Sequence, residues 1–322
     1  MSKCVPVNII VLLNHWFSNS IALVCWNGVF SNPYTISAGV RQGEVLSPFL
    51  FACYVDNLIL TLVNDGLGCH IGLQCMSVLM YADDLMLISG SLTQLQAMIN
   101  ACTAELEALD LTVNVRKSVC MRIGKSYNFN PSRLMSVNNC NIEWSDNLVY
   151  LGINVKSAAH FSVDLKTARA KFYRSFNAIY SKVSRANEYL IVSLVKSFCV
   201  PVIMYCLEAL NLDKSSIRSI DNMFFNSLGK IFKSYDRNVL SCCLYYFNVL
   251  PLKLEYYNRR VNFLSKLKKN DNSCLKTCFL LFGKRGLASI YGNDGIIANR
   301  SGDMRADIWD YFVSNLQALQ LI

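Results

Sequence analysis

The chain has 322 residues, of which 53% are hydrophobic and 16% are charged, so it can hold two domains or one large one. This composition supports a sizeable core and excludes a disordered protein. The formal net charge of +9 favours a polyanionic partner over an acidic protein or metabolite, although charge alone does not choose between nucleic acid and an anionic membrane surface.

The N-terminal part predicts a helix followed by a hairpin. Residues 7–17 carry apolar side chains at helical spacing. Residues 21–26 and 29–37 are expected to form two strands around the dipeptide Asn27-Gly28, a strong signal for a tight hairpin turn.

A glycine-flanked loop then leads into a helix. In the run Gly39-Val-Arg-Gln-Gly43, two glycines bracket an Arg-Gln pair. Ser47 and Pro48 follow as N-cap and first residue of a helix expected to reach about Asn64. Backbone amides of such a loop and the helix N-terminus favour a phosphate-bearing ligand, and a simple turn with a helix cap is the alternative.

Two apolar runs, residues 77–81 and 85–89, flank the tetrapeptide Tyr81-Ala-Asp-Asp84 and predict a β-hairpin. Its two adjacent aspartates would repel each other at the tip unless a cation lies between them. The alternative is an ordinary Asp-rich hairpin turn that binds no cation and has no catalytic role.

Together these residues resemble reverse transcriptases, in particular those of non-LTR retrotransposons. The resemblance covers about residues 5–153, and its motifs stand in the order of that family. They are Gly39-Val-Arg-Gln-Gly43 with Leu46-Ser-Pro48 (motif B), Tyr81-Ala-Asp-Asp84 (motif C), Asn114-Val-Arg-Lys117 (motif D) and Tyr150-Leu-Gly-Ile153 (primer grip).

The resemblance implies two-metal nucleotidyl transfer with Mg²⁺ or Mn²⁺, in which a primer 3′ hydroxyl attacks a dNTP on an RNA template. The roles it implies are catalysis and metal binding by Asp83 and Asp84, nucleotide or template binding by Arg41, Gln42, Gly43 and Lys117, and primer grip by Tyr150, Leu151 and Gly152. One carboxylate segment is missing from this pattern, because no acidic residue precedes Glu44. We therefore expect a C-terminal polymerase fragment without motif A and fingers, with very low or no activity by itself.

After Asp164 the chain becomes basic, with aromatic side chains interleaved in a helix-favouring run. The expected nucleic-acid-binding residues there are Lys166, Arg169, Lys171 and Arg174. In the family the thumb begins at this point, and a solvated cationic face is the alternative. A second basic group in residues 253–269 is expected to extend the duplex-binding surface or to hold structured RNA.

The resulting fold class is α+β: a partial right-hand palm, with an antiparallel sheet covered by helices, a helical thumb and a C-terminal extension. We place the palm at residues 1–155, the thumb at 156–250 and the basic extension at 251–322.

The sequence has 14 cysteines, and their irregular spacing favours free thiols in a reducing compartment.

The expected partners are an RNA template, a DNA primer or target and dNTP, with no membrane and no obligate protein partner. The expected location is intracellular, in cytoplasm and nucleus as a ribonucleoprotein, and not secreted.

Two other functions stay open. One is a non-catalytic nucleic-acid-binding remnant of a truncated element, and the other is a viral RNA-templated RNA polymerase, which Ala82 disfavours because such enzymes commonly carry Gly there.

Overall fold

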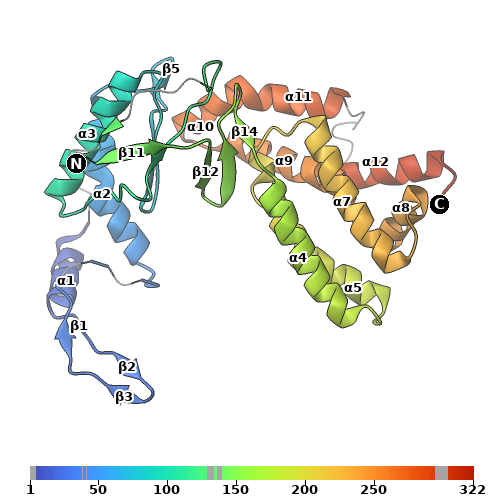
Figure 1. Ribbon diagram of the computed structural model, residues 1–322, viewed down its shortest axis with the longest axis horizontal. Helices are drawn as coiled ribbons and strands as arrows, with labels where there is room; N and C mark the ends of the chain where they lie inside the picture. The colour runs from blue at the N-terminus through green and yellow to red at the C-terminus, as the bar shows by residue number, and fades with distance from the viewer. Residues whose placement is uncertain (1–4, 38, 41, 129–133, 136–139, 294–303) are drawn as a thin grey trace. The chain divides into compact units, whose positions relative to one another are not determined.

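The computed structural model describes residues 5–37, 39–40, 42–128, 134–135, 140–293 and 304–322. Several of its elements are labelled along the chain in Figure 1. They fall into two compact units, the first formed by residues 1–67 and 77–112 and the second by residues 68–76 and 113–322. The functional divisions at residues 155 and 250 stay predictions.

The first unit begins with the predicted helix, and the predicted hairpin is divided into two short strand pairs. Its elements are α1 (Val7–Ser18), β1 (Ile21–Ala22), β2 (Cys25–Trp26), β3 (Val29–Phe30), β4 (Tyr34–Thr35), α2 (Ser47–Asn64), β7 (Val78–Tyr81), β8 (Asp84–Leu87) and α3 (Leu92–Ala108). The two pairs of the hairpin are β1–β4 and β2–β3. Strands β2 and β3 pair antiparallel around Asn27 and Gly28, whose φ angles of 49° and 81° are both positive. This turn matches the twist of the two strands, and it is the reason for the Asn-Gly signal.

The core of the first unit lies between α2 and α3. Leu58 and Leu62 of α2 pack with Met98 and Cys102 of α3, and apolar side chains of β7 and β8 cover them. By length and composition α2 would be able to cross a membrane, but its buried face places it in this core. Pro48 lies in its first turn as predicted, whereas the N-cap position belongs to Leu46 and not to Ser47.

The strands of the second unit form sheets of two or three strands. They are β5 (His70–Ile71), β6 (Gln74–Cys75), β9 (Val119–Cys120), β10 (Leu134–Met135), β11 (Asn141–Trp144), β12 (Asn147–Tyr150), β13 (Ile153–Lys156) and β14 (Ser162–Val163). The pairs β5–β6, β10–β11, β12–β13 and β13–β14 are antiparallel. Strands β9 and β11 pair in parallel, which the expected antiparallel sheet did not include.

The rest of the second unit is helical. Its helices are α4 (Lys166–Val183), α5 (Glu188–Leu194), η1 (Val195–Cys199), α6 (Val200–Met204), η2 (Leu207–Ala209), α7 (Lys214–Phe232), α8 (Arg237–Tyr246), α9 (Leu252–Lys269), α10 (Ser273–Cys278), η3 (Phe279–Gly283), α11 (Lys284–Asn293) and α12 (Met304–Ala318). One apolar core extends from Phe172 in α4 to Leu316 in α12. The mixture of small sheets and helices confirms the α+β class.

A proline interrupts the regular helix between α5 and α6. Pro201 lies in the first turn of α6, directly after the single π-helical turn η1. Proline has no N–H to donate and its ring crowds the preceding turn, so the chain widens there instead of continuing as an α-helix. The interruption of the helix before Pro201 therefore takes the form of a π-turn.

The strand β13 is tied to the start of α4 by Asp164. Its Oδ1 accepts the backbone N–H of Lys166 at 2.9 Å, and its Oδ2 lies 3.0 Å from Nζ of Lys156. The Lys166 N–H and the Lys156 ammonium hold the pKa of Asp164 below its usual value. This contact orients the basic helix relative to the β12–β13–β14 sheet.

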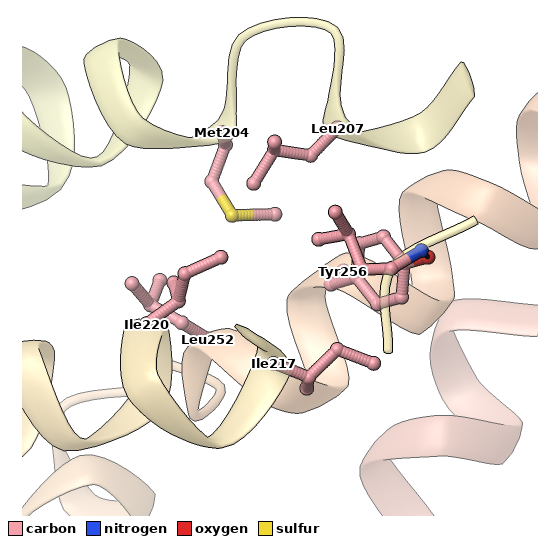
Figure 2. Close-up of a pocket in the computed structure, with 7 residues that line it drawn as sticks. Met204, Leu207, Ile217, Ile220, Leu252 and Tyr256 are labelled. Carbon is pink, nitrogen blue, oxygen red and sulfur yellow. Dashed lines mark hydrogen bonds between the residues drawn. The ribbon is translucent and has the colours of Figure 1, made fainter. Parts of the chain in front are cut away.

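A small apolar pocket lies between α6, η2, α7 and α9. Figure 2 shows the side chains of Met204, Leu207, Ile217, Ile220 and Leu252 around it, with Tyr256 at one side. The Tyr256 hydroxyl donates to the Leu210 carbonyl at 2.9 Å, so the polar group in this lining is already used. The pocket belongs to the core of the second unit.

Candidate active site and nucleic-acid surfaces

The two aspartates predicted to act in catalysis lie at the tip of the β7–β8 hairpin. Tyr81 pairs with Asp84, so Ala82 and Asp83 form a two-residue turn between the strands. Both aspartate side chains are exposed. Ala82 has a φ of 51°, a region that residues other than glycine rarely adopt. A two-residue hairpin turn requires a positive φ at its first residue, so this backbone fixes the place of Asp83 at the tip.

The donor set of this turn fits a hard divalent cation. Two neighbouring carboxylates in an exposed turn offer the oxygen ligands that Mg²⁺ and Mn²⁺ prefer, and they leave room for water and phosphate ligands. Within the described residues, no group of three or more His, Cys, Asp or Glu side chains is arranged to hold a metal.

The loop before α2 keeps the open backbone that its glycines predict. Gly39 and Gly43 both have a φ of 90°, and a Cβ on either would meet no atom within 4 Å. Gln42 lies in the turn and is exposed. The loop is thus accessible from solvent, while Arg41 lies outside the described residues.

The predicted motif D lysine lies in a turn of the second unit. The backbone N–H of Lys117 donates to the Asn114 carbonyl at 3.1 Å, and the Ser118 hydroxyl donates to the same carbonyl at 2.9 Å. The Asn114 side chain accepts from the Lys117 N–H as well, at 3.3 Å. These contacts explain why an asparagine suits position 114, whereas Lys117 contributes only its backbone N–H and its side chain is exposed.

The residues predicted to grip the primer form the end of the β12–β13 hairpin. Tyr150 pairs with Ile153, and the turn residues Leu151 and Gly152 have φ angles of 46° and 80°. The Tyr205 hydroxyl donates to the Leu151 carbonyl at 3.1 Å, and its ring carbon Cε1 lies 3.4 Å from where a Cβ on Gly152 would be. Tyr205 therefore holds this turn in place.

Sequence reasoning did not identify Tyr205. It follows α6 and lies 54 residues from Leu151 in the chain. Its neighbours Met204 and Cys206 give no pattern that would link it to the hairpin.

We expect Gly152→Ala to destabilise the chain by about 1 kcal/mol. The backbone at this turn is left-handed, and that conformation is unfavourable for a residue with a Cβ. For a unit of this size the destabilisation lowers Tm by about 2–4 °C, which thermal unfolding followed by circular dichroism would measure. Gly90→Ala is the matched control, because Gly90 is exposed, has no positive φ and has open space around it. Equal Tm values for the two variants would contradict the prediction.

The basic helix α4 separates its side chains into two faces. Phe172 and Phe176 are fully buried, whereas Lys166, Lys171 and Arg174 are exposed. Small residues such as Ala170 lie between the exposed cations, so a phosphate backbone can approach closely. Arg169, the fourth predicted residue, is half-buried.

The second basic group divides into buried and exposed members, and its expected contact with nucleic acid stays a prediction. Arg260 is buried and donates to the carbonyls of Glu208 and Leu210 at 3.1 and 2.6 Å, so it joins α9 to η2. Arg259 forms an ion pair with Glu255 at 2.8 Å. The cations of α9 that stay exposed lie in its last turn, at Lys266, Lys268 and Lys269.

These positions belong to different units. Gln42, Gly43, Asp83 and Asp84 lie in the first, and Lys117, the β12–β13 turn and α4 lie in the second. Within the second unit, Asp164 and Tyr205 connect the β12–β13 hairpin with the helices.

Comparison with known proteins identifies the source of these motifs. Residues 5–155 match the family described as reverse transcriptase (RNA-dependent DNA polymerase). The chain is 26% identical over 198 residues to the retrovirus-related Pol polyprotein from type-1 retrotransposable element R2 of Popillia japonica, across 58% of this chain and 27% of that protein.

Two further relatives match shorter stretches. The R2 polyprotein of Nasonia vitripennis is 37% identical over 79 residues, across 24% of this chain and 8% of the relative. The Pol polyprotein from type-2 retrotransposable element R2DM of Drosophila melanogaster is 31% identical over 98 residues, across 30% of this chain and 9% of that protein. The chain thus spans 27% or less of the length of these relatives. The motifs and the matches agree that residues 5–155 belong to the reverse transcriptase family, in the branch of the non-LTR retrotransposons.

Proposed function

We propose that this chain takes part in RNA-templated DNA synthesis by a non-LTR retrotransposon, holding the template and primer and presenting Asp83 and Asp84 to the incoming dNTP. The observation that carries the proposal is the exposed pair of carboxylates at a turn with a positive φ at Ala82. Members of the reverse transcriptase family generally depend on divalent metal and use a nucleic-acid template and dNTP substrates.

In the proposed reaction, the primer 3′ hydroxyl gives its proton to water and attacks the α-phosphorus of the dNTP. The bond between the α-phosphorus and the oxygen that bridges to the β-phosphate breaks, and pyrophosphate leaves. Asp83 and Asp84 would hold Mg²⁺, which lowers the pKa of the attacking hydroxyl and neutralises charge on the triphosphate.

The other residues would bind and orient the substrates. Gln42 and Gly43 offer an exposed polar side chain and a bare backbone to the nucleotide or template. Arg41 would bind the same ligand by its position in the motif. Lys117 brings a positive charge to the triphosphate. The turn at Leu151 and Gly152 would support the primer, and the exposed face of α4 would contact phosphates of the template–primer duplex.

Iron-mediated cleavage tests the metal site independently of polymerisation. Fe²⁺ binds where Mg²⁺ does at oxygen ligands, and with ascorbate and peroxide it cuts the nearby backbone. We expect cleavage within residues 78–87 that disappears in the double variant Asp83→Asn, Asp84→Asn, because both carboxylates are then neutral. Asp146→Asn, at another exposed position between two strands, should leave the cleavage unchanged. Cleavage that survives the double variant would contradict the assignment.

Primer extension separates this proposal from a non-catalytic remnant that only binds nucleic acid. A two-metal site takes carboxylates from at least two backbone segments, and the sequence has no Asp or Glu before Glu44. We therefore expect the chain alone to bind an RNA–DNA hybrid but to extend the primer very slowly or not at all. Mg²⁺-dependent extension that is lost in Asp83→Ala would contradict this expectation, and incorporation of rNTPs over dNTPs would favour an RNA polymerase.

A further inference from the structure

The turn between α7 and α8 holds an exposed tyrosine in a fixed position. Lys233 has a φ of 55° and ends α7. The ring of Tyr235 then folds back onto Gly229, where a Cβ would lie only 2.6 Å from the ring carbons Cδ1 and Cε1. The glycine therefore provides the bare helix surface on which the ring lies. Tyr235 is nevertheless 70% exposed, so much of its ring is open to solvent.

The backbone on either side of Tyr235 is also held. The N–H of Asp236 donates to Oγ of Ser234 at 3.4 Å, and the Asp236 carboxylate accepts the N–H of Asn238 at 2.8 Å as the N-cap of α8. The ring is thus oriented before any ligand arrives, which reduces the entropy lost on binding.

Positive charge surrounds the same end of α7. The Tyr180 hydroxyl near the end of α4 donates to the Lys230 carbonyl at 2.9 Å, which places the end of α4 against the last turn of α7. Lys182 and Arg185 follow Tyr180 and are exposed, as is Lys233. Asp236 and Glu188, which follow Tyr235 and precede Tyr189 in the chain, are exposed acids, and the carboxylate of Asp236 is engaged as a helix cap.

A second exposed aromatic side chain lies at this end. Tyr189 is 65% exposed and stacks on Phe247 with ring centroids 6.0 Å apart. Phe247 in turn contacts Phe232 of the last turn of α7, with centroids 5.4 Å apart. Aromatic rings and cations are therefore both presented where α4, α5, α7 and α8 meet.

We propose that this surface, defined by Lys182, Arg185, Tyr189, Lys233 and Tyr235 and here called the α7–α8 turn surface, binds single-stranded nucleic acid. A base stacks on the free face of Tyr235, and the lysines and arginine neutralise the phosphates on either side. An aromatic ring open on one face suits an unpaired base, because bases in a duplex already stack on each other. The inference rests on the proposed function for its class of partner but assigns a site outside the exposed face of α4.

Fluorescence anisotropy of the full chain with short labelled oligouridylate and oligothymidylate tests this site. We expect Tyr235→Ala to weaken binding about 10-fold, the usual effect of removing one stacked base, and Tyr235→Phe to keep it. Gly229→Ala should weaken binding as well, because its Cβ displaces the Tyr235 ring without removing it. Circular dichroism of each variant checks that the fold is kept.

Tyr246→Ala is the matched control and should bind as the wild type does. Tyr246 is 75% exposed, and no lysine or arginine lies between Arg237 and Lys253. Equal affinity for the two oligonucleotides supports stacking on any single strand, and a preference for one identifies the strand that binds here.

Two outcomes would overturn the inference, and they separate it from the proposed function. If Tyr235→Ala and Gly229→Ala bind single strands as the wild type does while the chain still binds an RNA–DNA hybrid, the α7–α8 turn surface is not the site and the proposed function stands. If the wild type binds neither single strands nor hybrid, both proposals fail.

Discussion

The triple variant Lys166→Ala, Lys171→Ala, Arg174→Ala is expected to bind an RNA–DNA hybrid about 100-fold more weakly than the wild type at moderate salt. The three side chains are exposed on α4, while Phe172 and Phe176 anchor its other face in the core. Each cation that contacts a phosphate releases counterions on binding, so affinity falls mainly through charge.

The salt dependence shows whether those contacts are made. Removing three phosphate contacts should make the slope of log K against log salt shallower by about 3. The triple variant Lys266→Ala, Lys268→Ala, Lys269→Ala is matched in charge, because it removes three exposed lysines from the last turn of α9. Equal losses in the two triple variants would show that total charge, and not the face of α4, determines binding.

Local sequence signals predicted the elements that carry the motifs. Asn27-Gly28 and Tyr81-Ala-Asp-Asp84 lie in hairpin turns, and α2 ends at Asn64 as predicted and begins one residue before the predicted start at Pro48. These features depend on residues that are neighbours in the chain, so a turn preference or an apolar period is sufficient to identify them. The positive φ of Ala82 had no such signal, since alanine does not favour that backbone.

Contacts between distant residues could not be predicted in this way. The sequence suggests that Arg260 belongs to a basic surface, but its guanidinium lies among carbonyls 50 and 52 residues away and is buried there. Tyr205 and Tyr235 likewise acquire their positions from packing, against the β12–β13 turn and against Gly229. Only the tertiary structure brings a guanidinium to its acceptors or a ring to a bare helix surface, so the charge pattern did not predict the burial of Arg260 or the place of either ring.

The largest effect on stability is expected from Phe176→Ala, at about 3–5 kcal/mol, because a fully buried phenyl ring is replaced by a cavity. Phe176 is completely buried and stacks between Phe172 and Tyr180, with centroids 6.4 and 5.6 Å apart. Nζ of Lys230 lies 5.9 Å from its centroid, so the ring also touches α7.

Thermal unfolding should show a Tm lower by about 10 °C, given about 2–4 °C per kcal/mol for a unit of this size. Phe282→Ala is the control, since Phe282 is 66% exposed and its loss should change stability by no more than about 0.5 kcal/mol. Phe176→Leu should recover part of the loss by filling the cavity.

Because the exposed cations lie on the opposite face of the same helix, Phe176→Ala should also weaken hybrid binding as α4 loses its anchor. A large drop in Tm with unchanged hybrid affinity below the transition would show that α4 keeps its place without this ring.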